Sequence, residues 1–200
     1  MRYFLSILAV TTFVSSSVAT SQESRFTRHR LSGGVAIEVP SHWHIVSVET
    51  RKNLQALAQA IMEKSGVERA PSRKEVVLAI NATPDPPGAT VRVVISIPPD
   101  YSRDDIVNAS PRELRELKSE MRAMFTTAER FGGPKLLEML DPRIEKVAGL
   151  PSLVLPYRRA GLTGPSPWYV TQYKIPLRDR LIEVTVSYRE ADQFVWKPII

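Results

Sequence analysis

The amino-acid sequence predicts an α+β domain in which helices pack on a largely antiparallel β-sheet. The strongest indication is the C-terminal stretch Trp168–Tyr188, where two runs of alternating residue types flank a tight turn at Pro176–Asp179. Two amphipathic segments interrupt the other predicted strands, which are mostly neighbours along the chain. The resulting order is strands, helix, strands, long helix, strands, short helix, and this order is typical of an antiparallel sheet covered by helices.

The first 19 residues have the pattern of a signal peptide, and we exclude them from the fold prediction. Arg2 supplies a positive charge, residues 4–14 are apolar, and Ser17-Val18-Ala19 resembles a cleavage site. The apolar run is shorter than the about 20 residues that a membrane span needs. We therefore expect cleavage after Ala19 and a single domain over residues 20–200. The alternative is an uncleaved N-terminal anchor.

The composition is that of a globular protein, with 43% hydrophobic and 24% charged residues. The sequence has no cysteine, which excludes disulfides, cysteine-based zinc sites and a lipidated cysteine. An exported chain without disulfides fits a bacterial periplasm better than a eukaryotic extracellular space. The net charge of +6 comes from scattered basic residues. It indicates either a soluble basic surface or attraction to an anionic partner. Export argues against nucleic acid as that partner.

The N-terminal half is predicted to begin with a hairpin at residues 26–39. Its strands, 26–31 and 35–39, are joined by Ser32-Gly33-Gly34, where glycine supplies the positive φ of a tight turn. Pro40 ends the second strand, and His44–Glu49 is expected to be extended.

A helix is predicted next, over Arg51–Lys64 with Thr50 as its N-cap. Its apolar residues follow 3.6-residue spacing, which predicts a face that packs on the core. They are Leu54, Leu57, Ala58, Ile61 and Met62. Strands are predicted at 75–81 and 90–97, separated by a proline-rich loop.

A second helix, Pro111–Phe131, has the clearest local signature in the sequence. Ser110-Pro111-Arg112-Glu113 forms a capping box with proline at the first helical position. An apolar stripe predicts that this helix packs on a face of the sheet. Its members are Leu114, Leu117, Met121, Phe125, Ala128 and Phe131.

The C-terminal half is predicted to contain a short helical turn at 135–140 and strands at 143–147 and 152–159. The closing hairpin follows, with Lys174 expected to face Glu183 across the two strands. Residues 190–200 are expected to form a docked helix, with Phe194, Val195 and Ile199 as its apolar residues.

Three of these segments together resemble the PsbP-like and DcrB-like family of exported α/β/α proteins. They are Val35–Trp43 (VAIEVPSHW), Gly149-Leu150-Pro151 before a strand, and the long closing hairpin followed by a helix. The resemblance implies a sheet sandwiched by helices, and a binding, assembly or accessory role instead of catalysis. It also implies that Pro40 and Trp43 are structural anchors that close a bend and pack the ring on the sheet edge. The chain departs from this family in lacking a lipoprotein cysteine, which leaves membrane attachment open.

One pair of histidines is a candidate for metal binding. His42 and His44 lie two residues apart, so an extended backbone places both imidazoles on one face. A third ligand would have to come from His29 or from a carboxylate such as Glu38 or Glu49. The alternative is that both are edge histidines beside a packed tryptophan.

Aromatic and basic side chains of the last three predicted strands are candidates for a binding face. Tryptophan, tyrosine and arginine are common anchors in binding sites. The same aromatic residues also serve in cores and in cross-strand packing, and this second interpretation stays open. The candidate binding residues are Trp168, Tyr169, Gln172, Lys174, Arg178, Arg180, Arg158 and Arg159.

The sequence contains no motif of a serine nucleophile elbow, a phosphate-binding loop or a zinc protease, and no cofactor is expected. The expected function is therefore that of an exported, non-enzymatic periplasmic binding or accessory protein. Its partner is expected to be another envelope protein or a small ligand. Two alternatives stay open. One is a metal-assisted hydrolase that uses His42 and His44. The other is a cationic protein that associates with envelope lipid without a transmembrane span.

Overall fold

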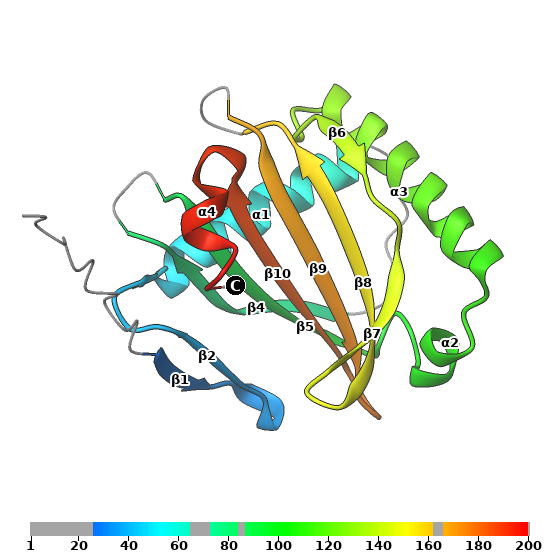
Figure 1. Cartoon of the computed structure of the whole chain (residues 1–200), viewed down its shortest axis with the longest axis horizontal. Helices are drawn as coiled ribbons and strands as arrows, with labels where there is room; N and C mark the ends of the chain where they lie inside the picture. The colour runs from blue at the N-terminus through cyan, green and yellow to red at the C-terminus, as the bar shows by residue number, and fades with distance from the viewer. Residues whose placement is uncertain (1–25, 65–72, 84–86, 162–165, 200) are drawn as a thin grey trace, which may run out of the picture.

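A central antiparallel sheet organises the computed structural model, which describes residues 26–64, 73–83, 87–161 and 166–199. Within these residues the sheet has eight strands in the order β3-β4-β5-β10-β9-β8-β6, and β7 pairs with the other part of β8 (Figure 1). The predicted α+β class is therefore confirmed. The elements are β1 (Phe26–Arg30), β2 (Ala36–Pro40), β3 (His44–Ile45), α1 (Val48–Lys64), β4 (Arg73–Asn81), β5 (Ala89–Ile97), α2 (Arg103–Val107), α3 (Pro111–Arg130), β6 (Leu136–Met139), β7 (Arg143–Val147), β8 (Leu150–Arg159), β9 (Trp168–Pro176), β10 (Leu181–Arg189) and α4 (Gln193–Trp196).

The C-terminal hairpin β9–β10 lies at the centre of the sheet, as its alternation predicts. β10 pairs with β5 on one side, and β9 pairs with β8 on the other. Lys174 and Glu183 are register partners, and the Lys174 ammonium donates to the Glu183 carboxylate at 2.6 Å. Leu181 and Ile182 at the start of β10 are almost fully buried. The central position follows from strands that are long enough to pair along both edges.

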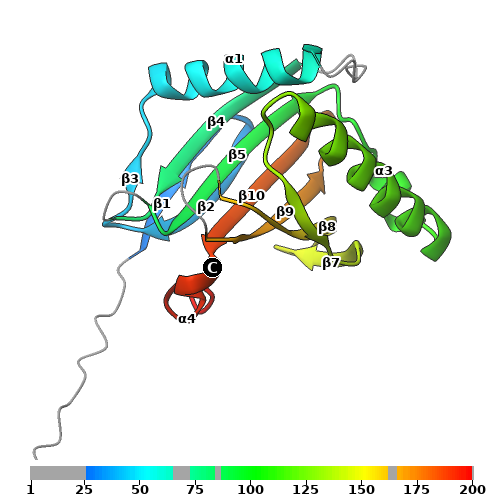
Figure 2. The ribbon, with the colours of Figure 1, turned by 90° about the horizontal axis from the view of Figure 1, so that it is seen from above.

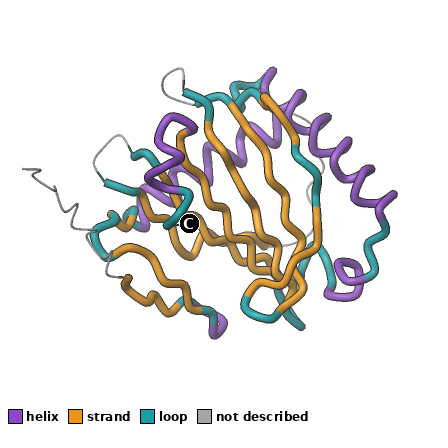
Figure 3. Tube along the Cα trace, in the orientation of Figure 1, coloured by secondary structure: helices purple, strands orange, loops and turns teal. Residues whose placement is uncertain are grey.

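Helices cover one face of the sheet, and a hairpin with a short helix covers part of the other. Figure 2 shows α1 and α3 above the sheet and α4 below it. β1 and β2 form a two-stranded sheet of their own, which stands apart from the main sheet (Figure 3). The predicted first hairpin is thereby confirmed. Its Val39 joins Trp43, Trp196 and the strands β4 and β5 in one core cluster.

The long helix α3 builds the second core cluster. Ser110 and Glu113 form the predicted capping box, and Gly132 follows the helix with φ +88°. Met121 and Phe125 are buried against β8. The ring centroids of Phe125 and Tyr157 lie 5.0 Å apart. The prediction that this helix packs on a sheet face is confirmed.

Helix α1 differs from its prediction at its start and in its orientation. It begins at Val48, because the Ser47 hydroxyl accepts the Thr50 backbone N–H at 3.1 Å and takes the capping role assigned to Thr50. Residues 48 and 49, which were expected to be extended, are therefore the first residues of this helix, whereas the Val46 N–H still donates to the Ala79 carbonyl of β4. Leu54 and Leu57 are exposed rather than packed on the core. The side chains of Ala58, Ile61 and Met62 lie outside the described part of the structure.

The orientation of α1 has a physical cause at the edge of the sheet. β3 pairs only with the last two residues of β4, so the rest of that edge presents backbone groups that need partners. Arg51 donates to the Val77 carbonyl and Gln55 donates to the Lys74 carbonyl. These two contacts turn Arg51 and Gln55 toward the sheet, and Leu54 and Leu57 lie on a different side of the helix and are exposed.

The segment predicted as a helical turn at 135–140 is instead the strand β6. It pairs with the end of β8, with Leu136 opposite Arg159 and Met139 opposite Tyr157. The strand β8 begins at Leu150, two residues before its predicted start, because Ala148 and Gly149 form the turn to β7. Both turn residues have positive φ, at 49° and 81°. Pairing partners, rather than local propensity, determine these boundaries.

The C-terminal segment docks through Trp196, which was not among the predicted residues, and through the predicted Ile199, which packs against the first core cluster. Trp196 is 9% exposed, whereas Phe194 and Val195 are 87% and 57% exposed. Trp43 donates its backbone N–H to the Pro40 carbonyl at 3.0 Å and closes the expected bend. Its ring packs in the core cluster and contacts Trp196. None of the described helices is long and apolar enough to cross a membrane.

Candidate functional site

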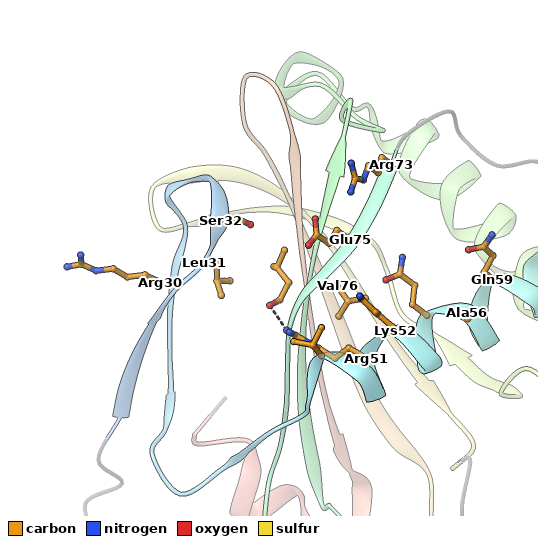
Figure 4. Close-up of a pocket in the computed structure, with 13 residues that line it drawn as sticks. Arg30, Leu31, Ser32, Arg51, Lys52, Ala56, Gln59, Arg73, Glu75 and Val76 are labelled. Atoms are coloured by element: carbon orange, nitrogen blue, oxygen red, sulfur yellow. Dashed lines mark hydrogen bonds between the residues drawn. The ribbon is translucent and has the colours of Figure 1, made fainter.

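A basic pocket with a volume of about 570 Å³ lies between the β1–β2 turn, the first half of α1 and the start of β4 (Figure 4). We call it the α1–β4 pocket. Its wall combines polar, cationic and a few apolar side chains. The residues that line it are Arg30, Leu31, Ser32, Val48, Arg51, Lys52, Gln55, Ala56, Gln59, Arg73, Glu75, Val76 and Val77.

Three local features of the chain build the α1–β4 pocket. Arg51 and Gln55 are one helical turn apart, so both face β4 and hold α1 beside it. The pairing of β4 with β5 shifts between Val76 and Leu78, next to the carbonyl that Arg51 binds. The Leu31 N–H donates to Val35 at 2.8 Å and closes the hairpin turn that forms the third wall.

Positive charge dominates the α1–β4 pocket. Figure 4 shows Arg51 and Lys52 on α1 and Arg73 and Glu75 on β4, whereas the Arg30 side chain extends outward from the hairpin. Glu75 is the single carboxylate in the lining. Among the described residues no carboxylate forms an ion pair with Lys52 or Arg73. The pocket therefore has an excess of cationic donors.

The Arg51 guanidinium has hydrogen-bond donors that are not used within the described residues. One of its terminal nitrogens donates to the Val77 carbonyl, while its Nε is buried and has no partner among the described residues. A buried polar atom without a partner is costly, so a group that satisfies it is favoured. The planar guanidinium matches phosphate and carboxylate oxygens, and such charge-assisted hydrogen bonds are stronger than neutral ones. This arrangement suits an anionic ligand.

A second region of interest, the tyrosine face, consists of Tyr169, Tyr173 and Tyr188. Alternation along β9 places Tyr169 and Tyr173 on the same side of the sheet, and Tyr188 of β10 is opposite Tyr169. The ring centroids of Tyr169 and Tyr188 are 5.5 Å apart. Both rings line a groove of about 520 Å³ with Arg143 and Lys197. In Figure 1 no described helix crosses β8 and β9 on this side.

The Glu190 carboxylate accepts the hydrogen bonds of both polar groups at the edge of the tyrosine face. Arg158 donates to both carboxylate oxygens of Glu190, at 2.7 and 2.8 Å, and the Tyr169 hydroxyl donates to the same group at 3.1 Å. The hydrogen bond from Arg158 lowers the pKa of Glu190, and the bond to Glu190 raises the pKa of Tyr169. Burial raises the pKa of Tyr173 and Tyr188. The three tyrosines are therefore neutral donors and apolar surfaces at neutral pH.

The eight predicted binding residues lie on both faces of the sheet and in one of its turns. Arg158 and Tyr169 lie on the tyrosine face, whereas Arg178 and Arg180 belong to the β9–β10 turn. The other four lie on the opposite face, toward α1 and α3: Trp168, Gln172, Lys174 and Arg159.

Contacts within the protein occupy several of the predicted binding residues. The Arg159 guanidinium lies 5.4 Å from the Trp168 ring centroid. Lys174 pairs with Glu183, and Arg180 pairs with Asp179. A single binding face made of all eight residues is therefore not formed, and a binding role for each of them stays a prediction.

The two candidate metal-binding histidines, His42 and His44, have exposed side chains on either side of the buried Trp43. The carbonyl of His42 accepts a hydrogen bond from the Thr83 hydroxyl at 3.2 Å. In the described part of the chain, no three histidine, aspartate or glutamate side chains converge as a metal site. The structure thus brings neither His29 nor a carboxylate to these histidines as a third ligand.

Sequence reasoning missed the α1–β4 pocket, although one signal was present. Arg51 and Lys52 lie near the N-terminus of α1, where the helix dipole disfavours cations. Arg73 lies at the start of β4. The unfavourable position of Arg51 and Lys52 relative to the helix dipole is visible in the sequence. Only the fold shows that they share a pocket with Arg73.

Comparison with known proteins shows similarity at the level of the fold. No protein-family model and no curated protein matches the chain. The solution structure of cyanobacterial PsbP from Synechocystis sp. PCC 6803 matches with a TM-score of 0.50 and 14% identity, covering 92% of each chain. This match confirms the predicted PsbP-like fold.

Two further solved structures match with lower TM-scores. One is LpqN, involved in cell envelope biogenesis of Mycobacterium tuberculosis, with a TM-score of 0.41 and 13% identity over 90% of this chain and 81% of that one. The other is PA94, a protein of unknown function from Pseudomonas aeruginosa, with a TM-score of 0.36 and 14% identity over 86% and 89%.

Proposed function

We propose that the protein is an exported, non-enzymatic accessory protein of the cell envelope that binds an anionic ligand in the α1–β4 pocket. The observation that carries this proposal is the convergence of Arg51, Lys52 and Arg73 on one pocket whose lining holds a single carboxylate, Glu75. Export is proposed from the pattern of residues 1–19. The single domain is proposed to extend over residues 20–200.

The chemistry of the α1–β4 pocket supports binding rather than proton transfer. A general acid or base works best when its pKa lies near the operating pH. Arginine stays protonated in proteins and only donates hydrogen bonds. Two of the three cations that converge on the pocket are arginines. Their fixed charges suit recognition of phosphate or carboxylate groups.

The volume of the pocket and its hydrogen-bond donors limit the kind of ligand that it can hold. A volume of about 570 Å³ is within the range of small-molecule sites. Each hydrogen bond to a charged group contributes about 1.5–3 kcal/mol. Apolar lining from Leu31 and Val76 leaves room for a ligand with a short apolar part beside its anionic group.

The test is calorimetric titration with inorganic phosphate and with citrate. The double variant Lys52→Gln/Arg73→Gln is expected to weaken binding about tenfold or more, which corresponds to about 1.4 kcal/mol. Both residues are exposed and make no ion pair with a described residue, so the fold should be retained. Binding by the unmodified protein should weaken as salt rises.

A matched control is Lys146→Gln/Arg115→Gln, which removes the same two charge types from exposed positions outside the pocket. This control is expected to bind phosphate and citrate like the unmodified protein. Equal weakening in both double variants would show that the anions respond only to net charge, and the proposed pocket would be rejected.

A second candidate function is docking of another envelope protein on the tyrosine face. The specific observation is that Tyr169 and Tyr188 present adjacent rings in an open groove, and tyrosine is a frequent interface anchor. Photo-crosslinking in cells from a probe at Tyr173 is expected to give one discrete adduct. The control is the same probe at the exposed Arg112 on α3, on the opposite face. Identical adducts from both positions would contradict this function.

A further inference from the structure

An apolar groove of about 270 Å³ lies between α2, the first half of α3 and the strands β7 and β8. We call it the α2–α3 groove. Figure 1 shows α2 next to the N-terminal end of α3. The floor of the groove is the outer surface of the second core cluster, so it is fixed by the packing of α3 on β8. The apolar residues that form this floor are Ile106, Leu114, Leu117, Ile144 and Leu153.

Four exposed carboxylates line the groove together with this floor, and the described residues that line it include no lysine or arginine. One carboxylate belongs to α2. The other three recur along α3 at spacings of three and four residues, which keeps them on one side of the helix. They span seven residues, or about 10 Å along the helix axis. The four residues are Asp105, Glu113, Glu116 and Glu120.

Most of this negative charge has no cation beside it. Among the described residues, only Glu116 of the four forms an ion pair, with Arg112. Both partners of that pair are largely exposed, so it contributes little to stability. The sequence as a whole has a net charge of +6. The α2–α3 groove is therefore an acidic site on a basic protein.

The two capping carboxylates keep their charge and have an oxygen left for a ligand. Hydrogen bonds from Ser102 and Ser110 lower the pKa of Asp105 and of Glu113, so both carboxylates are ionised at neutral pH. In the described part of the chain, the capping bonds use only Oδ2 of Asp105 and Oε2 of Glu113. The second oxygen of each group is left to accept a hydrogen bond from a cation.

We infer that the α2–α3 groove docks a segment of a partner protein in which basic residues flank a large apolar side chain. The apolar side chain covers the floor, and the lysine or arginine groups bind the carboxylates beside it through charge-assisted hydrogen bonds. A purely apolar segment satisfies none of the four carboxylates. This inference goes beyond the proposed anion-binding function and does not depend on it, because the α1–β4 pocket and the groove share no residue.

The charges favour a basic segment over other occupants. An acidic peptide or an anionic lipid surface places like charges together at the groove. A single small amine reaches one or two of four carboxylates that extend over about 10 Å, whereas a segment with several basic residues reaches more of them at once. A second copy of this chain would have to offer its cationic α1–β4 pocket. That contact joins two different surfaces, so it gives open chains of molecules rather than a closed dimer.

The experiment is selection from a displayed library of random hexapeptides on the purified protein. We expect the retained peptides to carry at least two basic residues beside a leucine, phenylalanine or tryptophan. The Kd of the most enriched peptide is then measured by fluorescence anisotropy. Glu116→Gln/Glu120→Gln should raise this Kd about tenfold. Both side chains are exposed, so the fold should be retained.

Two further variants separate the groove from general effects. The matched control Glu63→Gln/Glu129→Gln removes two exposed glutamates from α1 and α3 at positions outside the groove. It should leave the Kd unchanged. Ala109→Leu tests the apolar floor, because a larger side chain at this lining position takes up room in the groove. It should raise the Kd about tenfold, the effect of excluding one apolar side chain.

Several results would overturn the inference. They are a selection that retains no peptides or peptides without basic residues, and an equal rise of the Kd in both glutamate double variants. Sedimentation velocity tests the remaining occupant. Concentration-dependent association of the unmodified protein that Glu116→Gln/Glu120→Gln abolishes would identify a second copy as the occupant and reject the basic segment. Titration of Glu116→Gln/Glu120→Gln with phosphate and citrate should match that of the unmodified protein, so failure of the anion-binding function leaves this inference standing.

Discussion

The indole rings of Trp43 and Trp196 meet edge to face, with centroids 5.6 Å apart and planes inclined at 82°. Trp43 follows the bend after β2, and Trp196 ends α4. Both rings are at least nine-tenths buried, and both belong to the core cluster that β4 and β5 share with the first hairpin. This contact therefore joins the beginning of the described domain to its end.

Trp196→Ala is expected to lower the free energy of unfolding by about 3–5 kcal/mol, because it opens a large cavity in the core and removes an aromatic pair. Urea unfolding followed by far-ultraviolet circular dichroism measures the change. Phe194→Ala, two residues earlier and exposed, should change stability by about 0.5 kcal/mol or less. Similar losses in both variants would show that Trp196 is not the docking residue.

Gly88→Ala is expected to displace the C-terminal segment. A Cβ at Gly88 would lie 2.6 Å from Nε1 of Trp196 and 2.9 Å from a carboxylate oxygen of Asp192. Crowding of this kind costs about 1–3 kcal/mol, since the buried indole cannot move without losing its packing. In a Trp196→Ala background most of this cost should disappear, which a double-mutant cycle measures. Additive effects would contradict the contact.

Stability is expected to fall at alkaline pH through Tyr157. Burial raises the pKa of Tyr157 to about 12, against about 10 in an unfolded chain. Because the folded pKa is the higher one, the contribution of the neutral phenol is complete below pH 10. It is lost as the pH rises toward 12. This pKa difference of about two units between the folded and unfolded chain corresponds to roughly 2–3 kcal/mol of unfolding free energy.

Tyr157→Phe tests the pH prediction, because it removes the titrating group and keeps the ring beside Phe125. The difference in unfolding free energy between the two proteins, measured by urea titration from neutral to alkaline pH, should change in this window. A constant difference across the window would exclude Tyr157 as the cause.

Export of the protein predicts a defined N-terminus. Mass spectrometry of protein recovered from a bacterial periplasm is expected to find a chain that begins at Thr20, because small residues at Ser17 and Ala19 suit a signal peptidase. Ala19→Arg should block cleavage and leave the leader attached. A periplasmic product that still carries Met1 would favour the uncleaved anchor instead.

Several elements were predictable because short-range contacts specify them. The capping box of Ser110 and Glu113 lies within one turn, and the alternation in β9 and β10 repeats every two residues. The register that pairs Lys174 with Glu183 follows from the turn between those strands. β6 was missed because its only signal is the free edge of β8, which the local sequence does not reveal.

The candidate pocket was not predictable for a related reason. Hydrophobic spacing predicted an apolar face for α1, but it did not show that Arg51 and Gln55 would face the sheet. The unpaired carbonyls of Val77 and Lys74 decided this, since they take donors from Arg51 and Gln55. The aromatic binding face was divided because neighbours in sequence, such as Trp168 and Tyr169, point to opposite faces of a strand.

By itself the sequence determined the α+β class, the central hairpin, the capped helix α3 and the position of the bend at Pro40. These features depend on periodicity, capping and turn chemistry among residues that are close along the chain. Only the tertiary structure decided that Leu54 and Leu57 of α1 are exposed, that Trp196 meets Trp43, and that Arg51, Lys52 and Arg73 share one pocket. Each of these depends on which distant backbone groups and surfaces remain unsatisfied once the sheet has formed.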